Sequence, residues 1–293
     1  MVRARLYLPD TEKGYYQGTR FDWSGVIASL EFKGHNFFGK WFEKYDPKIH
    51  DAITGPVEEF LTGASSVGYD EAAPGESFVR IGVGAVKKTD GSPYQRFRTY
   101  EITDPGKRSM RRGPDWIEFT HELGDTAGYS YVYRKTLRLT AGKPELTLEH
   151  SLRNTGRKPI RTSVYNHDFF MLDGLPTSAD VVVRFPFEAR AKNSFGDLAA
   201  IRGRELVYLK ELEGRETVLS ELEGFGGTAA DFDFRVENRR ANIGVRQTGD
   251  RPISKVVFWS PRTTVCPEAY IDLNVEPGQE TRWRVSFEFY TLR

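Results

Sequence analysis

Apolar and polar residues alternate strictly near the C-terminus, over residues 282–290. Large apolar side chains occupy every second position, namely Trp283, Val285, Phe287 and Phe289. Successive side chains of a strand point to opposite faces, so this alternation predicts a strand with one buried face. Strands are also predicted for residues 129–139 and 145–153. The turn-forming segment Ala-Gly-Lys-Pro at 141–144 separates them, and this arrangement predicts a hairpin.

Short strand-like segments with turn residues between them continue along the whole chain. Convincing amphipathic helices are nearly absent, and no internal repeat, low-complexity segment or linker divides the sequence. Such a pattern predicts an all-β sandwich. A chain of 293 residues is long enough for two domains, but all-β folds of this length often form one. We therefore expect a single domain over residues 1–293.

The charge balance limits the classes of partner. The chain has 42 Lys and Arg against 41 Asp and Glu, a net charge of +1, whereas a dedicated nucleic-acid binder is usually clearly basic. Aromatic residues make up 13% of the chain; strands use them heavily, and sugar-binding clefts also stack them on sugar rings. Cys266 is the single cysteine, which excludes an intrachain disulfide and a zinc–thiolate cluster.

The sequence contains no segment suited to a membrane. No apolar run approaches the roughly 18 residues of a membrane span, so no membrane partner is expected. The N-terminal sequence MVRARLYLPD lacks the apolar core of a signal peptide. The default expectation is a cytoplasmic protein; a periplasmic or secreted protein would look the same once its signal peptide had been removed.

Residues 161–174, RTSVYNHDFFMLDG, contain the clearest candidate for a catalytic side chain. The segment begins as a β-favouring run. Its alternation predicts one face with Tyr165, His167 and Phe169 and an opposite face with Val164, Asn166 and Phe170. A lone histidine among aromatic side chains is more often a satisfied core residue than a proton-transfer group, and the residues alone leave both open.

Other residues offer weaker candidates. Arg20 and Trp23 lie in the loop-like segment 14–25, where they either pack in a turn, with Arg20 paired to Asp22, or contact a sugar. His150 shares a strand face with three leucines, which predicts a structural histidine. Residues 106–113, GKRSMRRG, predict a solvated hairpin turn; a phosphate site is the alternative, because arginine forks fit phosphate oxygens.

A metal site is not expected. His35 and His50 could be ligands together with Glu58 or Glu59, but no tight spacing supports such a set. Glu58 and Glu59 are adjacent in a predicted strand, so their side chains point to opposite faces and cannot both serve one site.

Several motifs resemble the aldose 1-epimerase (galactose mutarotase) family. The family's Asn-His-x-Phe/Tyr-Phe-x-Leu signature is matched by Asn166, His167, Phe169, Phe170 and Leu172. Residues 265–268, VCPE, resemble its Cys-x-Glu strand. Residues 133–139 and 146–160 resemble its central meander, in which a strand ends in an Asn-Thr-Gly turn, here residues 154–156. The resemblance spans nearly the whole chain and is best from Tyr131 onward. It implies a galactose mutarotase-like supersandwich of antiparallel sheets, with the ligand cleft on one concave sheet.

The resemblance also implies roles for individual residues. His167 would be the general acid and Glu268 the general base of a mutarotase, which opens and recloses a pyranose ring to interconvert α and β anomers. Because a sugar ring must fit between them, we expect roughly 5–8 Å between the carboxylate and the imidazole. The expected substrate-binding residues are Arg20, Trp23, Arg98, Asn166 and Tyr165. The implied partner is a small sugar, and no cofactor is implied.

One departure from the family pattern keeps other functions open. The segment around Arg98 resembles the one that follows the first active-site histidine of hexose mutarotases, but Pro93, Tyr94 and Gln95 occupy the place of that histidine and its glycine. His35 or His121 could substitute in space, or Arg98 could polarise the sugar alone. The departure favours a second interpretation, a saccharide-binding module without catalysis. A third is a stand-alone sandwich domain with polysaccharide hydrolase or lyase chemistry. The identity of the sugar, and whether it is phosphorylated, stays open.

Overall fold

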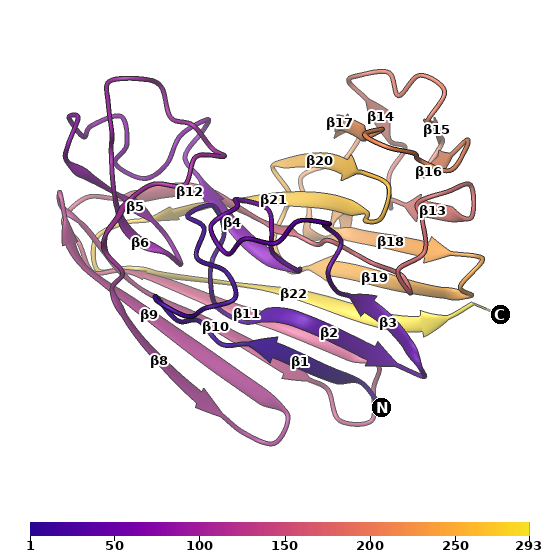
Figure 1. Ribbon diagram of the computed structural model, residues 1–293, viewed down its shortest axis with the longest axis horizontal. Coiled ribbons are helices and arrows are strands. Elements are labelled where there is room, and N and C mark those ends of the chain that lie inside the picture. Colours follow the sequence, from indigo (N-terminus) through magenta and orange to yellow (C-terminus); the bar gives the residue numbers. More distant parts are fainter. Residues whose placement is uncertain (293) are drawn as a thin grey trace.

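The computed structural model describes residues 1–292, and these residues form an all-β protein of antiparallel sheets, as predicted (Figure 1). Within the described chain, the single helical element is a 3-10 turn, η1, at Ala229–Asp231. None of the helical structure in residues 1–292 has the length and apolarity needed to cross a membrane.

The larger of the two main sheets has ten strands. Its spatial order is β15-β16-β13-β18-β19-β22-β11-β10-β9-β8. In chain order its strands are β8 (Lys107–Arg112), β9 (Trp116–Thr126), β10 (Tyr129–Leu139), β11 (Glu145–Asn154), β13 (Val181–Arg184), β15 (Ala199–Arg202), β16 (Glu205–Tyr208), β18 (Asp233–Asn238), β19 (Ile243–Gly249) and β22 (Glu280–Thr291). The predicted alternating strand near the C-terminus is β22, and it lies in the middle of this sheet between β19 and β11.

The smaller main sheet has six strands in the order β14-β17-β20-β21-β12-β4. They are β4 (Val57–Leu61), β12 (Ile160–His167), β14 (Arg190–Ala191), β17 (Val218–Glu223), β20 (Lys255–Ser260) and β21 (Cys266–Val275). Two three-stranded sheets complete the fold. One contains β1 (Arg3–Tyr7), β2 (Val26–Phe32) and β3 (His35–Phe38), and the other contains β5 (Ser77–Arg80), β6 (Gly84–Lys87) and β7 (Ile102–Asp104).

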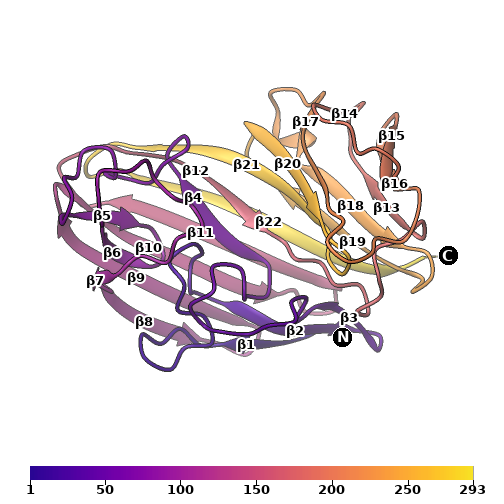
Figure 2. The same cartoon turned by 45° about the horizontal axis from the view of Figure 1, so that its top comes forward.

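The two main sheets pack face to face. Figures 1 and 2 both place β12 and β21 alongside β11 and β22. Apolar side chains of both sheets meet in one buried cluster, which includes Leu148 and Phe287 of the ten-stranded sheet and Val256 and Phe258 of the six-stranded sheet. Burial of such side chains is the main stabilising contribution to a sandwich, at about 25 cal/mol per Å² of apolar surface. The six-stranded sheet therefore has an inner face toward this core and an outer face turned away from it.

A small polar group is enclosed between the sheets. Nε2 of His150 lies 2.9 Å from one carboxylate oxygen of Glu58, and Nζ of Lys135 donates to the other. The imidazole of His150 also stacks on Trp283, with ring centroids 4.7 Å apart. His150 is thus a buried structural histidine, as its strand pattern predicted.

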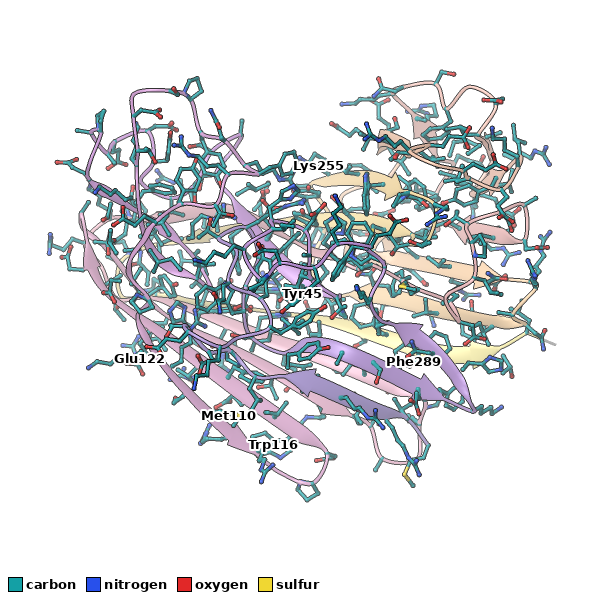
Figure 3. The ribbon with its side chains drawn as sticks, viewed as in Figure 1. Tyr45, Met110, Trp116, Glu122, Lys255 and Phe289 are labelled. Atoms are coloured by element: carbon teal, nitrogen blue, oxygen red, sulfur yellow. The ribbon has the colours of Figure 1, made fainter. Side chains whose placement is uncertain are left out.

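The predicted hairpin turn at residues 106–113 is wrong. Residues Lys107–Arg112 form the edge strand β8, which pairs along its length with β9. Met110 and Trp116 lie at this lower edge of the sheet (Figure 3), and Arg111 forms an ion pair of 2.6 Å with Glu118. Lys107, Arg111 and Arg112 are therefore exposed charges on an edge strand, where they discourage pairing with another chain, whereas Arg108 turns inward and donates to the carbonyls of Gly82 and Val83.

Candidate active site

A pocket of about 340 Å³ lies on the outer face of the six-stranded sheet. Strands of the sheet supply the floor through His167, Leu219, Val257, Trp259 and Glu268. Loops from the N-terminal third and the segment after β12 supply the walls through Arg20, His50, Asp51, Arg96, Phe97 and Phe169. The side chains proposed for proton transfer are thus fixed on strands, while most of the wall residues come from loops.

His167 is the last residue of β12 and is 3% exposed. Phe169 lies just after the strand, where a φ of 46° turns the chain and lets its ring stack on the imidazole, with centroids 3.8 Å apart. Phe21 and Trp259 contact the same imidazole edge-on. Burial, assisted by the nearby charge of Arg20, holds the pKa of His167 well below its usual range. The imidazole is therefore neutral at physiological pH.

Glu268 lies on β21 directly beside this histidine. Its Oε1 is 3.2 Å from Nε2 of His167, and its Oε2 accepts a hydrogen bond of 3.1 Å from the hydroxyl of Tyr270. Burial raises the pKa of Glu268 to about 7, although the positive charges of Arg96 and Arg20 oppose the rise. Near neutral pH this carboxyl group is therefore present in both protonation states.

The expected gap of 5–8 Å between the two side chains is wrong, because they are in contact. The register of the sheet is the reason. β12 and β21 are adjacent antiparallel strands with Tyr165 opposite Tyr270, and the same register places His167 opposite Glu268. Directly opposed residues in such a pair have Cβ atoms only about 5 Å apart.

A buried charge cluster forms the side of the pocket next to Tyr165. The carboxylate of Glu59 on β4 accepts hydrogen bonds from Nε of Arg20 at 2.9 Å and from Nη2 of Arg96 at 2.8 Å. The hydroxyl of Tyr165 donates to the same carboxylate at 2.6 Å and accepts from both arginines. Burial would raise the pKa of Glu59, but the surrounding arginines outweigh it and lower the pKa. Arg20 and Tyr165, both predicted at the site, therefore meet around an ionised carboxylate.

Arg98 is not part of this pocket. Its Nη1 donates to Asp90 at 3.2 Å on the same loop, and Arg96, two positions earlier, lines the pocket instead. Residues 94–102 alternate in sequence as a strand would, which puts both arginines on one face, but the chain makes a turn at residues 96 and 97, so Arg96 and Arg98 point to different surroundings.

Trp23 and Asn166 also lie away from the pocket. Trp23 is 2% exposed within an N-terminal core cluster, and its indole donates to the carbonyl of Gly18. Asn166 occupies the inner face of β12, where its amide donates to Glu58 at 2.8 Å. Strand alternation predicted that Asn166 and His167 lie on opposite faces of the strand, as they do. The placement of Asn166 therefore does not support the sugar-binding role that the signature implies.

Neither proposed substitute for the missing histidine lies in the pocket. His121 is buried in the ten-stranded sheet, where its ring contacts the carbonyl of Pro105 and the hydroxyl of Tyr131. His35 pairs with Asp173 at 2.7 Å. The second imidazole of the pocket is His50, which stacks on the exposed ring of Phe97. The sequence had indicated His50 only as a weak candidate metal ligand, with no spacing that linked it to His167.

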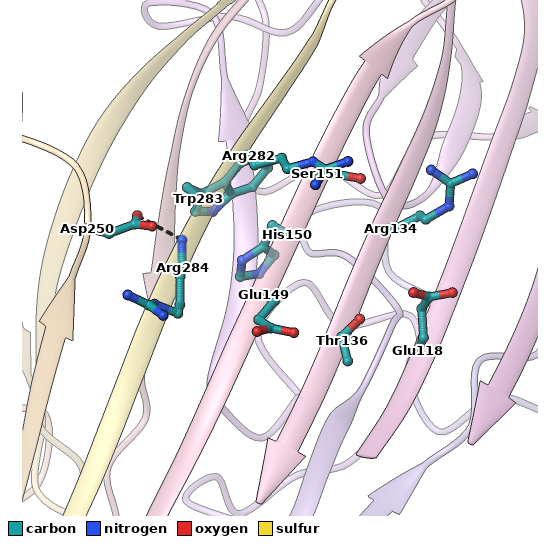
Figure 4. A pocket seen from close by; sticks show the side chains of 10 residues that line it. All are labelled: Glu118, Arg134, Thr136, Glu149, His150, Ser151, Asp250, Arg282, Trp283 and Arg284. Carbon is teal, nitrogen blue, oxygen red and sulfur yellow. Dashed lines mark hydrogen bonds between the residues drawn. The ribbon is translucent and has the colours of Figure 1, made fainter. Parts of the chain in front are cut away.

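A larger hollow lies on the outer face of the ten-stranded sheet (Figure 4). It has a volume of about 500 Å³ and is lined by acidic and basic side chains of β9, β10, β11 and β22. Its one histidine, His150, turns its Nε2 to Glu58 in the core. Over residues 1–292, no three His, Cys, Asp or Glu side chains are grouped as a metal site would require.

Two packed antiparallel sheets, with a polar pocket on the smaller one, give the chain a galactose mutarotase-like fold. The solved structures that it resembles bear this out. A galactose mutarotase-like protein from Clostridium acetobutylicum has a TM-score of 0.58 and 11% identity, covering 100% of this chain and 99% of that chain. A putative aldose 1-epimerase from Escherichia coli K12 has a TM-score of 0.56 and 13% identity, covering 100% of both chains.

A galactose 1-epimerase from Lactobacillus acidophilus NCFM is similar over the same extent, with a TM-score of 0.57, 9% identity and coverage of 100% of this chain and 99% of that chain. At these identities the similarity is one of fold. No protein-family model matches the sequence, and no curated protein matches it.

Proposed function

We propose that this protein is a sugar mutarotase that interconverts α and β anomers in the pocket of His167 and Glu268. The observation that carries the proposal is the 3.2 Å contact between Nε2 of His167 and Oε1 of Glu268 at the floor of a pocket. The fold neighbours named as aldose 1-epimerase and galactose 1-epimerase support this choice of reaction.

The reaction needs two proton transfers at adjacent oxygens. Opening the ring removes the proton of the C1 hydroxyl and adds a proton to the ring oxygen, while the bond between C1 and the ring oxygen breaks. Both oxygens are bonded to C1, so a donor and an acceptor that touch each other can serve both at once. The contact between His167 and Glu268 is therefore suited to a concerted exchange, without a sugar ring between them.

The protonation states favour roles opposite to those implied by the family resemblance. A neutral imidazole has one nitrogen that accepts a proton, and a protonated carboxyl group is a donor. We assign Glu268 as the acid at the ring oxygen and His167 as the base at the C1 hydroxyl. The transfers leave an imidazolium next to a carboxylate, and these opposite charges stabilise each other. After the C1–C2 bond turns, the reverse transfers close the ring and restore the pair.

The walls of the pocket support sugar binding. Arg20 and Arg96 present guanidinium donors for hydroxyl groups, and the rings of Phe97 and Trp259 offer flat apolar surfaces for a pyranose. General acid–base groups typically contribute roughly 10²–10⁴ in rate, which is the size of effect that the two catalytic side chains must supply.

Polarimetry of freshly dissolved α-glucose and α-galactose tests the proposal. We expect His167→Ala and Glu268→Gln each to lose at least about 100-fold in kcat/KM, whereas His35→Ala, at the partly exposed His35–Asp173 pair, keeps the wild-type rate. Wild-type protein that leaves the spontaneous rate of every sugar tested unchanged would contradict the proposal.

A saccharide-binding protein without catalysis is the second candidate. The observation in its favour is that neither His35 nor His121 replaces the missing histidine in the pocket. Calorimetry that detects sugar binding, together with polarimetry that detects no rate enhancement, would select it.

A further inference from the structure

The positive charge around Glu59 exceeds the negative charge. Three guanidinium groups lie within 4.0 Å of this single carboxylate: those of Arg20 at 2.9 Å, Arg96 at 2.8 Å and Arg80 at 3.7 Å. Arg20 is 7% exposed and Arg80 is 2% exposed. Buried charges are normally paired, because removing an ion from water is costly. The cluster therefore holds two more positive charges than its carboxylate neutralises.

Arg80 is satisfied within the protein and contributes only its charge. Its Nε donates to the carbonyl of Thr19, its Nη1 donates to the hydroxyl of Tyr94, and its Nη2 donates to the carbonyl of Arg20. These contacts fix the loop that carries Arg20 against β5. Arg80 does not line the pocket.

Arg20 and Arg96 line the pocket and keep donors available to a ligand. The hydrogen bonds of Arg96 to Glu59 and Tyr165 use its Nε and Nη2, which leaves Nη1 outside them, and the side chain is 31% exposed. Nη1 of Arg20 has one neighbour, Nδ1 of His50, at 3.5 Å. Glu59 and Tyr165 already orient both guanidinium groups, so their remaining donors are held in place before a ligand arrives.

The other acidic groups of the pocket do not cancel this charge. Asp51 lies 3.9 Å from the imidazole of His50, and Glu268 is protonated in the proposed reaction. In that reactive form, a full negative charge counted for Asp51 still leaves the three guanidinium groups one positive charge in excess of the carboxylates of Glu59 and Asp51. A neutral sugar would leave that charge without a partner.

We propose that the sugar bound here carries an anionic group, a carboxylate or a phosphate, which is held between Arg20 and Arg96. This inference rests on the proposed function, because it names the class of sugar that the same pocket takes. Guanidinium groups bind carboxylate and phosphate oxygens through paired N–H donors. A nearby anion also favours the protonated form of Glu268, which is the form that donates to the ring oxygen.

Comparison of charged and neutral sugars tests the inference. Mutarotation and calorimetric binding are measured with glucuronate, galacturonate and glucose 6-phosphate against glucose and galactose. We expect a kcat/KM at least tenfold higher for one anionic sugar than for its neutral counterpart. Preference for the uronates identifies the carboxylate, and preference for glucose 6-phosphate identifies the phosphate. Equal or higher kcat/KM with the neutral sugars overturns the inference and leaves the mutarotase proposal standing.

Variants of two neighbouring arginines sharpen the comparison. Arg96→Gln should weaken binding of the preferred anionic sugar by roughly 10- to 100-fold, since hydrogen bonds to charged groups are the strong ones, and should weaken binding of the neutral sugar less. Arg98→Gln, two positions away and paired with Asp90, should change neither. Equal losses for charged and neutral sugars in Arg96→Gln would overturn the inference. Tight binding of an anionic sugar without turnover would retain it and reject the mutarotase.

Discussion

The carboxylates of Glu58 and Glu59 are adjacent in sequence but lie on opposite faces of the six-stranded sheet. Glu58 points into the core, where it contacts Lys135, and Glu59 points to the pocket, where it contacts Arg20 and Arg96. Strand alternation predicted this separation, and it is confirmed. One short strand, β4, thus anchors both a structural charge group and the charged side of the candidate active site.

We expect Glu58→Gln to destabilise the protein by about 3–5 kcal/mol, because Lys135 would remain buried without its counter-ion. The Lys135 side chain is fully buried, so water cannot replace the lost carboxylate. Urea unfolding followed by tryptophan fluorescence measures the loss. Burial alone would raise the pKa of Glu58, but Lys135 and His150 lower it to about 2 from 4.5. This stabilisation is therefore present above pH 4.5 and is lost as the pH falls toward 2.

The double variant Glu58→Gln/Lys135→Met provides the control for that ion pair. It removes both charges, so its loss of stability should be smaller than the sum of the two single losses. Additive losses would show that the contact contributes no coupling energy.

The pH dependence of the reaction should show which group is the acid. If Glu268 donates to the ring oxygen, kcat/KM for a neutral sugar falls as the pH rises through about 7, the pKa to which burial raises this carboxyl group. The rate should fall about tenfold per pH unit above that point, because the protonated fraction does. The pKa of His167 lies well below its usual range, so the base stays neutral on the acid side.

Subtraction of the spontaneous, buffer-catalysed rate at each pH is the necessary control for this profile. A rate that instead rises through about pH 7 would assign the carboxylate as the base and restore the roles implied by the family resemblance. Glu268→Gln should show no inflection near pH 7 in either case, because an amide does not titrate there.

Much of the architecture could be predicted from the sequence, because strand alternation is a local property. The hairpin of β10 and β11, the alternation of β22 and the opposite orientations of Asn166 and His167 all follow from a two-residue period. The candidate residues His167 and Glu268 were found through their resemblance to family motifs rather than through spacing.

Other features of the site depend on contacts between distant segments and could not be predicted from the sequence. The register between β12 and β21 decides that His167 touches Glu268, and no local pattern encodes a pairing across about a hundred residues. The two-residue alternation around Arg96 and Arg98 does not form a strand, because the chain turns at residues 96 and 97, so only packing against Glu59 shows that Arg96 faces the pocket. His50 and Phe97 are brought together in the same way.

We expect Phe169→Leu to lower kcat more than it lowers stability. Phe169 lies between His167 and Trp41, and its ring is nearly parallel to both. Leucine keeps most of the buried volume but loses the flat contact, and aromatic pairs contribute about 0.5–1.5 kcal/mol beyond buried area. Looser support of the imidazole should reduce kcat up to about tenfold, whereas the melting temperature changes by only a few degrees. An unchanged kcat would show that Phe169 does not position the histidine.

Phe97 should affect binding of the sugar rather than the chemical step. Its ring is 56% exposed at the pocket, stacks on His50 at 4.7 Å, and has the guanidinium groups of Arg20 and Arg96 over it, so its exposed part can contact a ligand that these arginines hold. Among residues 1–292, the ring contacts of Phe97 are with His50, Arg20 and Arg96 and do not include His167. We therefore expect Phe97→Ala to raise KM by roughly 5- to 10-fold, the effect of losing one aromatic contact, and to leave kcat within about twofold.

Initial rates over a range of sugar concentrations separate the two constants. Met110→Ala is the matched control, because Met110 is a similarly exposed apolar side chain at the edge strand β8, far from the pocket in the fold. It should change neither constant. A fall in kcat at unchanged KM in Phe97→Ala would show that the ring acts after binding, for example by excluding water from the reacting oxygens, and would contradict its assignment as a sugar-stacking surface.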